Sequence, residues 1–288
     1  MLVFFGDTNS ELWWERLEQT DIQMINMPYI LDGELRNVDL GKNKDYIEFF
    51  DKVKNGVEAS TCGLNKEEYI NYFEPHLRNG DDIIYVSFSH NMSNTFEYMN
   101  QAIAELKVKY PERSIHTVQT RQISVGEAVI LWQTYKEYKQ GKSAEEIVKF
   151  VEQFSDEVIT AFAVDDLNHL KKGGRISGAT AFFGSLLGIK PILHVSQDGR
   201  IEKLDKAKGK KQAMEYLLNL IKSKGTNVAD YPIAIMHANE PELAEEFAGK
   251  VREYVGEDAE IWVQPIGPTI GTHCGPGTFG VAFHGKRM

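Results

Sequence analysis

The sequence has few cysteines, no excess of basic residues and no long apolar run. Its 288 residues include only Cys62 and Cys274, which form no paired-cysteine metal motif and are too few for a disulfide framework. We therefore expect a reducing, cytoplasmic location. Lys and Arg total 32 against 42 Asp and Glu, a formal charge of −10. This balance argues against nucleic acid or an anionic membrane as the main partner, because both are bound through clustered basic side chains.

No segment is long enough to cross a bilayer, which takes about 20 predominantly apolar residues. The short apolar run from Met1 to Asp7 lacks the basic start of a signal peptide and predicts a buried first strand. The sequence does contain abundant apolar material, including 15 Phe, 12 Tyr and 4 Trp. These residues exclude whole-chain disorder, and the length predicts one large or two medium domains.

Short β-branched apolar runs alternate with longer helical patterns. The predicted strands are 2–5, 22–25, 83–86, 115–118, 159–164, 192–195, 233–236, 261–263 and 279–283. The predicted helices are 94–107, 124–140, 143–154, 208–224 and 242–255. This alternation predicts an α/β protein with mainly parallel sheets flanked by helices. We place a domain boundary near residue 160, which gives an N-terminal α/β domain over 1–160 and a C-terminal one over 161–288.

A serine-rich turn directly follows the predicted strand 83–86. Ligands of parallel sheets bind beyond the carboxyl ends of strands, and a helix start there offers N–H groups and hydroxyls to an anion. Asn94, with Glu97 three residues on, resembles a capping box for the next helix. The alternative is that Ser93 and Thr95 merely cap that helix.

Two further motifs contain residues suited to an anion. Ser60 and Thr61 follow a polar stretch, although serine–threonine pairs are also common helix caps. Gly173 and Gly174 permit a tight turn in which the Arg175 side chain or backbone amides face an anion. No Gly-Lys-Ser/Thr follows, so this is not a Walker loop.

His273 lies in the segment 266–278, whose glycines and prolines predict a rigid irregular loop. That setting favours a histidine that binds a ligand or donates a hydrogen bond, while no histidine spacing supports zinc or another metal. The apolar helical stripe from Phe182 to Leu187 fits either core packing or the wall of a tunnel for a long apolar ligand.

In this order along the chain, the motifs resemble those of the DegV family of bacterial fatty-acid-binding proteins. The resemblance runs nearly end to end and rests on these segments: Asp7 to Ser10, Ser60-Thr61, Ser89 to Thr95, Leu170 to Ser177, Leu187 to Leu193 and Ile270 to Gly277. It implies a two-domain α/β fold that holds one long-chain, palmitate-like fatty acid in an apolar tunnel between or beside the domains. It also implies that the bound fatty acid is the ligand and that there is no cofactor.

The resemblance implies that Thr61, with Ser60 adjacent, Ser93 and His273 hold the carboxylate. The motif reasoning above adds Asn94, Thr95 and Arg175 to the candidate fatty-acid-binding residues. In the family such a protein is a carrier rather than an enzyme: it presents the carboxylate to a separate fatty acid kinase subunit, which makes an acyl phosphate for lipid metabolism. Transient membrane contact is compatible with this role.

At three places the chain departs from the family pattern. His90 stands where many relatives have a serine, Asn94 where they have glycine, and Gln119-Thr120 where an aspartate–serine pair is common. These positions fall at the lip of the expected pocket, and none of them is Thr61 or Ser93.

Two enzymatic alternatives remain open at this point. In the first, a serine hydrolase, Ser93 is the nucleophile, His273 the base and Asp7 the best available acid, although no Gly-x-Ser-x-Gly motif is present. In the second, the protein is itself a kinase that binds phosphate through Gly173, Gly174 and Arg175, although no acidic cluster for Mg²⁺ is evident.

Overall fold

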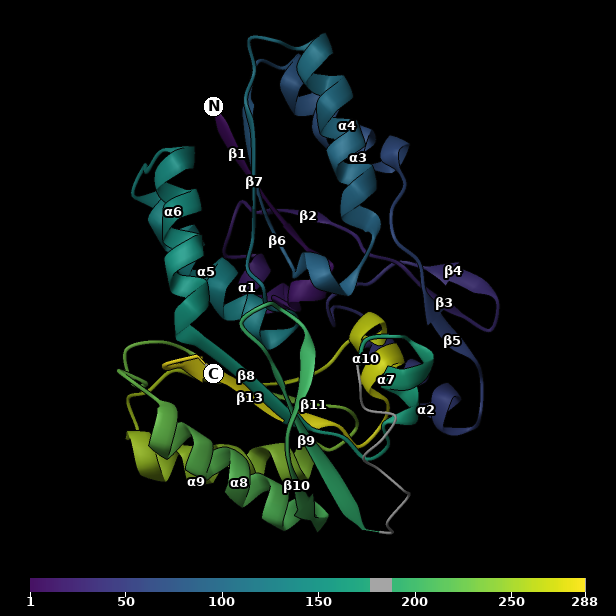
Figure 1. The fold of residues 1–288 in the computed structure, drawn as a ribbon, viewed down its shortest axis with the longest axis vertical. Helices are drawn as coiled ribbons and strands as arrows, with labels where there is room; N and C mark the ends of the chain where they lie inside the picture. Colours follow the sequence, from purple (N-terminus) through teal and green to yellow (C-terminus); the bar gives the residue numbers. More distant parts are fainter. Residues whose placement is uncertain (177–187, 288) are drawn as a thin grey trace.

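The computed structural model of the chain describes residues 1–176 and 188–287. The predicted stripe from Phe182 to Leu187 therefore lies outside the described residues. The described part contains two large β-sheets with helices packed on them, and a small third sheet (Figure 1). The α/β class expected from the alternation of strands and helices is confirmed.

The N-terminal sheet is parallel throughout, in the order β2-β1-β6-β7. Its strands are β1 (Leu2–Asp7), β2 (Gln23–Ile25), β6 (Asp82–Ser87) and β7 (Ile115–Gln119). The flanking helices are α3 (Lys66–Arg78), α4 (Thr95–Lys109) and α6 (Ala144–Phe154). Strand β6 is a continuous apolar run because both of its faces are covered. Here the expectation of parallel strands is correct.

The C-terminal sheet has the order β10-β9-β8-β13-β11-β12, and within the described residues only β11 and β12 pair in parallel. Its strands are β8 (Val158–Ala163), β9 (Ile189–Val195), β10 (Ile201–Lys208), β11 (Ile233–His237), β12 (Ile261–Pro265) and β13 (Phe279–His284). The expectation of mainly parallel strands is wrong for this sheet. A short turn joins β9 to β10 as a hairpin, and β13 inserts between β8 and β11. A buried strand is apolar whether it pairs with its neighbours in parallel or antiparallel. The composition of these strands therefore did not reveal that most of them pair antiparallel.

Helix α5 (Val125–Lys139) lies between the two large sheets. It packs on β8, β11 and β13 of the C-terminal sheet, and its Leu131 side chain contacts Gly6 of β1. Helices α8 (Gly209–Lys224) and α9 (Pro241–Val255) pack on the C-terminal sheet, below it in Figure 1. One hydrophobic core therefore joins residues of both halves, from Phe4 to Trp262. The predicted boundary at residue 160 falls within β8, and the division into two domains stays a prediction.

A third group of elements was not predicted from the sequence. It comprises the small antiparallel sheet of β3 (Tyr29–Leu31), β4 (Glu34–Arg36) and β5 (Ala59–Thr61), and the helices α1 (Trp14–Leu17), α2 (Asp45–Lys54), α7 (Asn168–Lys172) and α10 (Pro268–Cys274). Short 3-10 helices cover Thr8–Ser10, His90–Met92 and Ser155–Glu157. Among the described helices, none has the length and apolar composition needed to cross a membrane.

Candidate functional site

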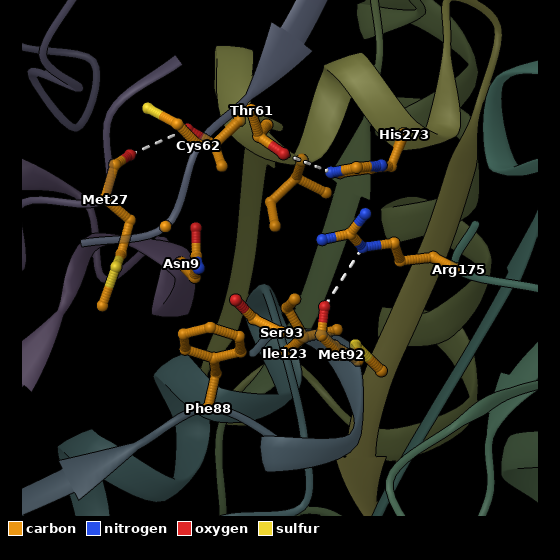
Figure 2. Close-up of a pocket in the computed structure, with 13 residues that line it drawn as sticks. Asn9, Met27, Thr61, Cys62, Phe88, Met92, Ser93, Ile123, Arg175 and His273 are labelled. Carbon is orange, nitrogen blue, oxygen red and sulfur yellow. Dashed lines mark hydrogen bonds between the residues drawn. The ribbon is translucent and has the colours of Figure 1, made fainter. Parts of the chain in front are cut away.

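A small cavity of about 50 Å³, which we call the polar cavity, is lined by Thr61, Ser93, Arg175 and His273 (Figure 2). It lies at the carboxyl edge of the parallel sheet, where the turns after β1 and β6 contribute Asn9 and Ser93. The other lining residues are Met27, Cys62, Gly63, Phe88, Met92, Ile123, Thr269 and Ile270. Four of the predicted site residues thus meet at one place.

Thr61 and His273 lie side by side in the wall of the cavity (Figure 2). The Thr61 hydroxyl lies 3.0 Å from His273 Nε2. Burial, and then the charge of Arg175, lower the pKa of His273 to about 4, so its imidazole is neutral at physiological pH. The ring packs against Gly173, where a Cβ atom would fall 2.1 Å from His273 Nδ1. A glycine is therefore required at that position for the histidine to reach the cavity.

His273 belongs to a helix and not to the predicted irregular loop. Helix α10 begins at Pro268, and His273 is in its last turn. Proline is compatible with the first turn of a helix because its missing N–H would have no intrahelical partner there. Because glycines are typical of loops, the sequence predicted a loop in this segment, where the structure has a seven-residue helix.

Arg175 brings a positive charge to the polar cavity. Its Nε donates to the backbone oxygen of Met92 at 3.1 Å, and Nη1 donates to the oxygen of Gly173. Among the described residues no carboxylate forms an ion pair with it. Burial lowers its pKa, yet a guanidinium remains protonated in proteins. The cavity is therefore suited to an anion.

The glycine turn before Arg175 offers no backbone cradle. The N–H groups of Gly173, Gly174 and Arg175 donate to the oxygens of His169, Lys171 and Leu170, which closes the end of α7. The expectation that backbone amides could face an anion here is therefore wrong, and the Arg175 side chain is what the turn supplies.

The hydroxyls of Ser93 and Thr95 have different surroundings. Ser93 Oγ accepts from the Thr95 backbone N–H at 3.2 Å, and its own proton remains available to a ligand. Thr95 Oγ1 accepts from Leu64 N, donates to Leu64 O and lies 3.0 Å from the Tyr69 hydroxyl. Thr95 therefore lies behind the polar cavity and anchors the loop after Thr61.

Asn94 and Ser60 are exposed at the rim. Asn94 makes no side-chain cap hydrogen bond, so the predicted capping box is absent; Ser93 Oγ binds the first helical N–H instead. Ser60 alternates with Thr61 on the strand β5 and faces away from the polar cavity. It lines a neighbouring hollow.

Two larger hollows adjoin the polar cavity. One of about 630 Å³ shares Thr61, Arg175 and His273 with it and is also lined by Val57 and Lys172. The other, of about 450 Å³, shares Ser93 and Arg175 and includes Asn94. The polar groups can thus be approached from the surface.

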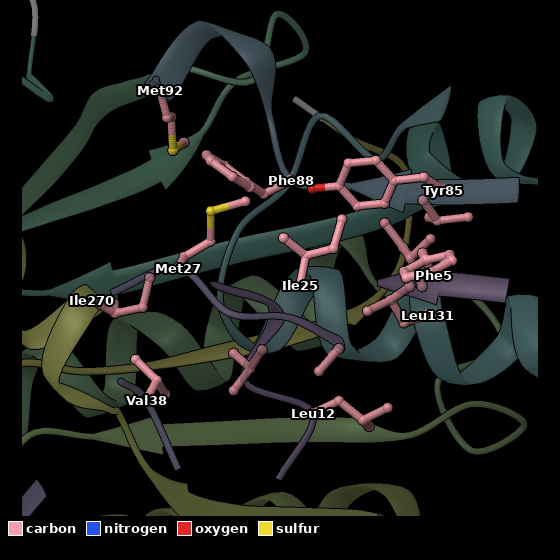
Figure 3. Packing of buried hydrophobic residues seen from close by; sticks show 14 of the residues in the cluster. Phe5, Leu12, Ile25, Met27, Val38, Tyr85, Phe88, Met92, Leu131 and Ile270 are labelled. Atoms are coloured by element: carbon pink, nitrogen blue, oxygen red, sulfur yellow. The ribbon is translucent and has the colours of Figure 1, made fainter. Parts of the chain in front are cut away.

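Apolar side chains close the inner end of the polar cavity. Met27, Phe88, Met92 and Ile270 belong to the continuous core, and Figure 3 shows them packed with one another. At about 50 Å³, against ~10–15 Å³ for one water, the cavity is too small for a long acyl chain. The expected tunnel is therefore not open among the described residues, where these apolar side chains pack against one another.

Most of these lining residues were missed by the sequence reasoning. Asn9 and Met92 had a usable signal, since each follows a parallel strand at its carboxyl end. Met27 and Ile123 had none, because an apolar residue next to a ligand has the same pattern as one in the core, and Ile270 was known only as the first residue of a family motif.

His90 and Gln119, expected from the sequence at the lip of the pocket, contact each other but line neither the polar cavity nor its two hollows. The His90 backbone N–H donates to Gln119 Oε1 at 2.9 Å, while His90 Nε2 lies 3.0 Å from Ser87 Oγ. The His90 ring stacks on Phe96 at 3.8 Å, and burial lowers its pKa to about 4. The contacts of His90 are therefore those of a structural residue.

The geometry does not support the serine hydrolase. His273 Nε2 is bonded to Thr61, and His273 Nδ1 has no acidic partner among the described residues. Asp7 instead accepts from Asn9 N, Phe88 N and the Tyr85 hydroxyl at 3.0–3.2 Å. The kinase alternative lacks a metal site within residues 1–176 and 188–287.

The sequence matches the model of the DegV family, described as an uncharacterised protein family, over residues 5–286. A DegV domain-containing protein of Clostridium perfringens is 34% identical over 98% of this chain and 97% of its own length. The structure resembles the fatty-acid-binding protein DegV of Bacillus subtilis, at 25% identity, a TM-score of 0.83 and 99% coverage of both chains. It also resembles a DegV family protein of Thermus thermophilus described by its fatty acid binding, at 24% identity, a TM-score of 0.86 and 99% coverage of both.

Proposed function

The chain belongs to the DegV family, and we propose that it binds a long-chain fatty acid with the carboxylate in the polar cavity. The single observation that carries this proposal is the meeting of Thr61, Ser93, Arg175 and His273 around one small cavity. The relatives named above that bind fatty acids support the same ligand class.

The head group would be satisfied by charge and by hydrogen bonds. A buried carboxylate without partners is costly by several kcal/mol. Arg175 supplies the opposite charge, and the Ser93 and Thr61 hydroxyls supply donors. The Thr61 proton is free for the ligand when the neutral His273 donates from Nε2 to Thr61 Oγ1.

The tail would enter the space now filled by Met27 and Met92. Hydrogen bonds fix both backbones. The Met27 N–H donates to Thr8 Oγ1, the Thr269 hydroxyl donates to Met27 O, and Arg175 Nε donates to Met92 O. Their unbranched thioether side chains can nevertheless adopt new rotamers. A chain inserted there gains about 0.8 kcal/mol per buried methylene.

We further propose that the protein is a carrier that presents the carboxylate to a separate kinase subunit. The hollows of about 630 and 450 Å³ leave the head-group end approachable from outside. The exposed Ser60 and Asn94 and the rim residue Lys172 would then face the partner. We also propose that the chain is divided into two domains. The N-terminal domain would supply the hydroxyl groups of the Ser/Thr loops, and the C-terminal domain would supply Arg175 and His273.

The test is native mass spectrometry of the purified protein, before and after addition of palmitate. We expect one bound long-chain acid of about sixteen to eighteen carbons rather than a short one, because each buried methylene adds about 0.8 kcal/mol of binding free energy. Calorimetry with ATP and Mg²⁺ should give no heat of binding, because ATP would bind to the separate kinase subunit and not to this protein. A protein that neither carries nor takes up a fatty acid contradicts the proposal.

A further inference from the structure

The turn of a hairpin in the C-terminal sheet lies against the serine-rich turn of the N-terminal sheet. The hairpin turn, residues 196–200, joins β9 to β10. The serine-rich turn, residues 89–93, follows β6 and ends at Ser93. No residue of the hairpin turn lines the polar cavity or either of its two hollows. The hairpin turn can therefore act on the site only through the segments that it contacts.

Three side-chain hydrogen bonds join the two turns. Ser89 Oγ donates to the Gly199 backbone oxygen at 2.7 Å, and Asn91 Nδ2 donates to the Asp198 backbone oxygen at 2.6 Å. Arg200 Nη2 donates to Asn91 Oδ1 at 2.8 Å. Both polar atoms of the Asn91 amide are thus bonded to the hairpin turn.

The contact requires a glycine and rests on two ordered turns. The φ of Gly199 is +75°, and a Cβ atom there would fall 2.1 Å from the buried Ser89 Oγ. Within the hairpin turn, Gly199 N–H donates to the Ser196 oxygen and Ser196 N–H donates to the Arg200 oxygen, both at 2.8 Å. Within the serine-rich turn, Met92 N–H donates to the Ser89 oxygen at 3.1 Å. Each turn therefore has a defined shape before the two meet.

The same hairpin also holds the segment that carries Arg175. Ile176 forms a β-bridge with Ile201, the first residue of β10. Arg175 Nε in turn donates to the Met92 backbone oxygen at 3.1 Å, as Figure 2 shows. The hairpin, the Arg175 segment and the serine-rich turn thus contact one another in a closed set beside the polar cavity.

We propose that the hairpin turn positions Ser93 and Arg175 for the carboxylate, and that Asn91 and Arg200 are positioning residues of the fatty acid site. This inference rests on the proposed function. A hydrogen bond weakens steeply outside a narrow range of distance and angle. A site whose supporting contacts are lost therefore binds its ligand less well, even when the residues that touch the ligand are intact.

The inference also gives a role to Ser89. This residue belongs to the segment on which the family resemblance rests, yet it does not line the polar cavity. Its hydroxyl proton is used in the bond to Gly199, whereas that of Ser93 is available to a ligand. The two serines of the turn thus differ: Ser89 attaches the turn to the hairpin, and Ser93 faces the carboxylate.

The first test needs no ligand and uses amide hydrogen exchange of the full chain, followed by mass spectrometry. Asn91→Ala removes two of the three bonds and Arg200→Ala one, and both side chains are exposed, so the core is unchanged. We expect exchange in residues 89–95 to become about threefold faster in both variants. Lys206→Ala removes an exposed cation from the same hairpin, away from the turn, and should leave that exchange unchanged.

The second test measures palmitate affinity by calorimetry. Asn91→Ala and Arg200→Ala should each weaken binding about threefold, and Lys206→Ala should not. Arg200 lines none of the three spaces, so its loss cannot be a lost contact with the ligand. In a Ser93→Ala background, Asn91→Ala should have almost no further effect, because the hydroxyl that it positions is absent.

Three results overturn the inference. They are unchanged exchange of residues 89–95 in both variants, full palmitate affinity in both, and the same loss from Asn91→Ala with and without Ser93. The last would mean that Asn91 supports the fold in general and not this hydroxyl. A wild-type protein that binds no palmitate contradicts the proposed function, and the exchange measurement still decides whether the hairpin holds the serine-rich turn.

Discussion

The hydroxyl of Thr61 and Nε2 of His273 lie 3.0 Å apart, although 212 positions separate the two residues. This contact joins the end of β5 in the small sheet to the last turn of α10. It positions a hydroxyl at the polar cavity and connects the early serine–threonine motif to the C-terminal histidine motif.

Removal of either hydroxyl should weaken fatty acid binding. Thr61→Ala and Ser93→Ala each leave one carboxylate oxygen without a donor, which costs about 1–3 kcal/mol. Calorimetry with palmitate measures the loss. Ser60→Ala is the matched control because that hydroxyl is exposed on the opposite side of β5, and its affinity should equal that of the wild type. Undiminished affinity in both test variants would remove these residues from the site.

Loss of the Arg175 charge should have a larger effect. A hydrogen bond to a charged group contributes about 1.5–3 kcal/mol, so Arg175→Gln should weaken palmitate binding about ten- to a hundredfold. Lys172→Gln makes the same change of charge at the rim of the larger hollow and should have little effect. Binding to the wild type should also weaken as salt is raised, and binding to Arg175→Gln should depend on salt less. Equal losses in the two variants would contradict direct contact with Arg175.

The position of a candidate site residue could be predicted from the sequence where that residue follows a long, recognisable element. Ser93 comes after the apolar run of β6, and the rule of strand carboxyl ends places it at the polar cavity, while its role in binding stays a prediction. Thr61 lies in a three-residue strand, which is too short for its alternation to be recognised, and the family resemblance supplied it instead. Nothing local predicted Met27, because its role at the cavity depends on which distant segments surround it. The antiparallel position of β13 between β8 and β11 was likewise not predictable, because it depends on contacts between segments that are distant in the sequence.

A buried carboxyl group should make stability fall as pH rises. Burial raises the pKa of Asp7 from 3.8 to about 7, so the folded state holds a proton that the unfolded state has released. The stabilisation is complete below about pH 4 and is lost as pH rises through about 7. Urea unfolding of the wild type and of Asp7→Asn across pH 4–8 should show this as a declining difference between the two proteins.

The comparison with Asp7→Asn reports on Asp7 together with Glu127, because the neighbouring Asp7 carboxyl is one of the causes, after burial, that raise the pKa of Glu127. Burial lowers the pKa of His273 and of His237 to about 4, which contributes stability that is lost as pH falls below about 6.5. These histidines are present in both proteins, so their effect cancels in the difference. Parallel stability curves for the two proteins would mean that Asp7 is ionised in the folded state.

Substitutions in the inner apolar wall and in the outer hollow should show which of the two the acyl tail enters. Met27→Trp fills the space beside Phe88 and Met92, and should abolish palmitate binding while acetate, which has no tail, still binds at the polar cavity. Val57→Trp narrows the hollow of about 630 Å³ by the same side chain and should leave palmitate binding unchanged. Overpacking costs about 1–3 kcal/mol, so thermal unfolding must accompany each measurement, and Met27→Phe provides a milder block. If Val57→Trp loses palmitate and the Met27 variants retain it, the tail runs along the small sheet and not into the core.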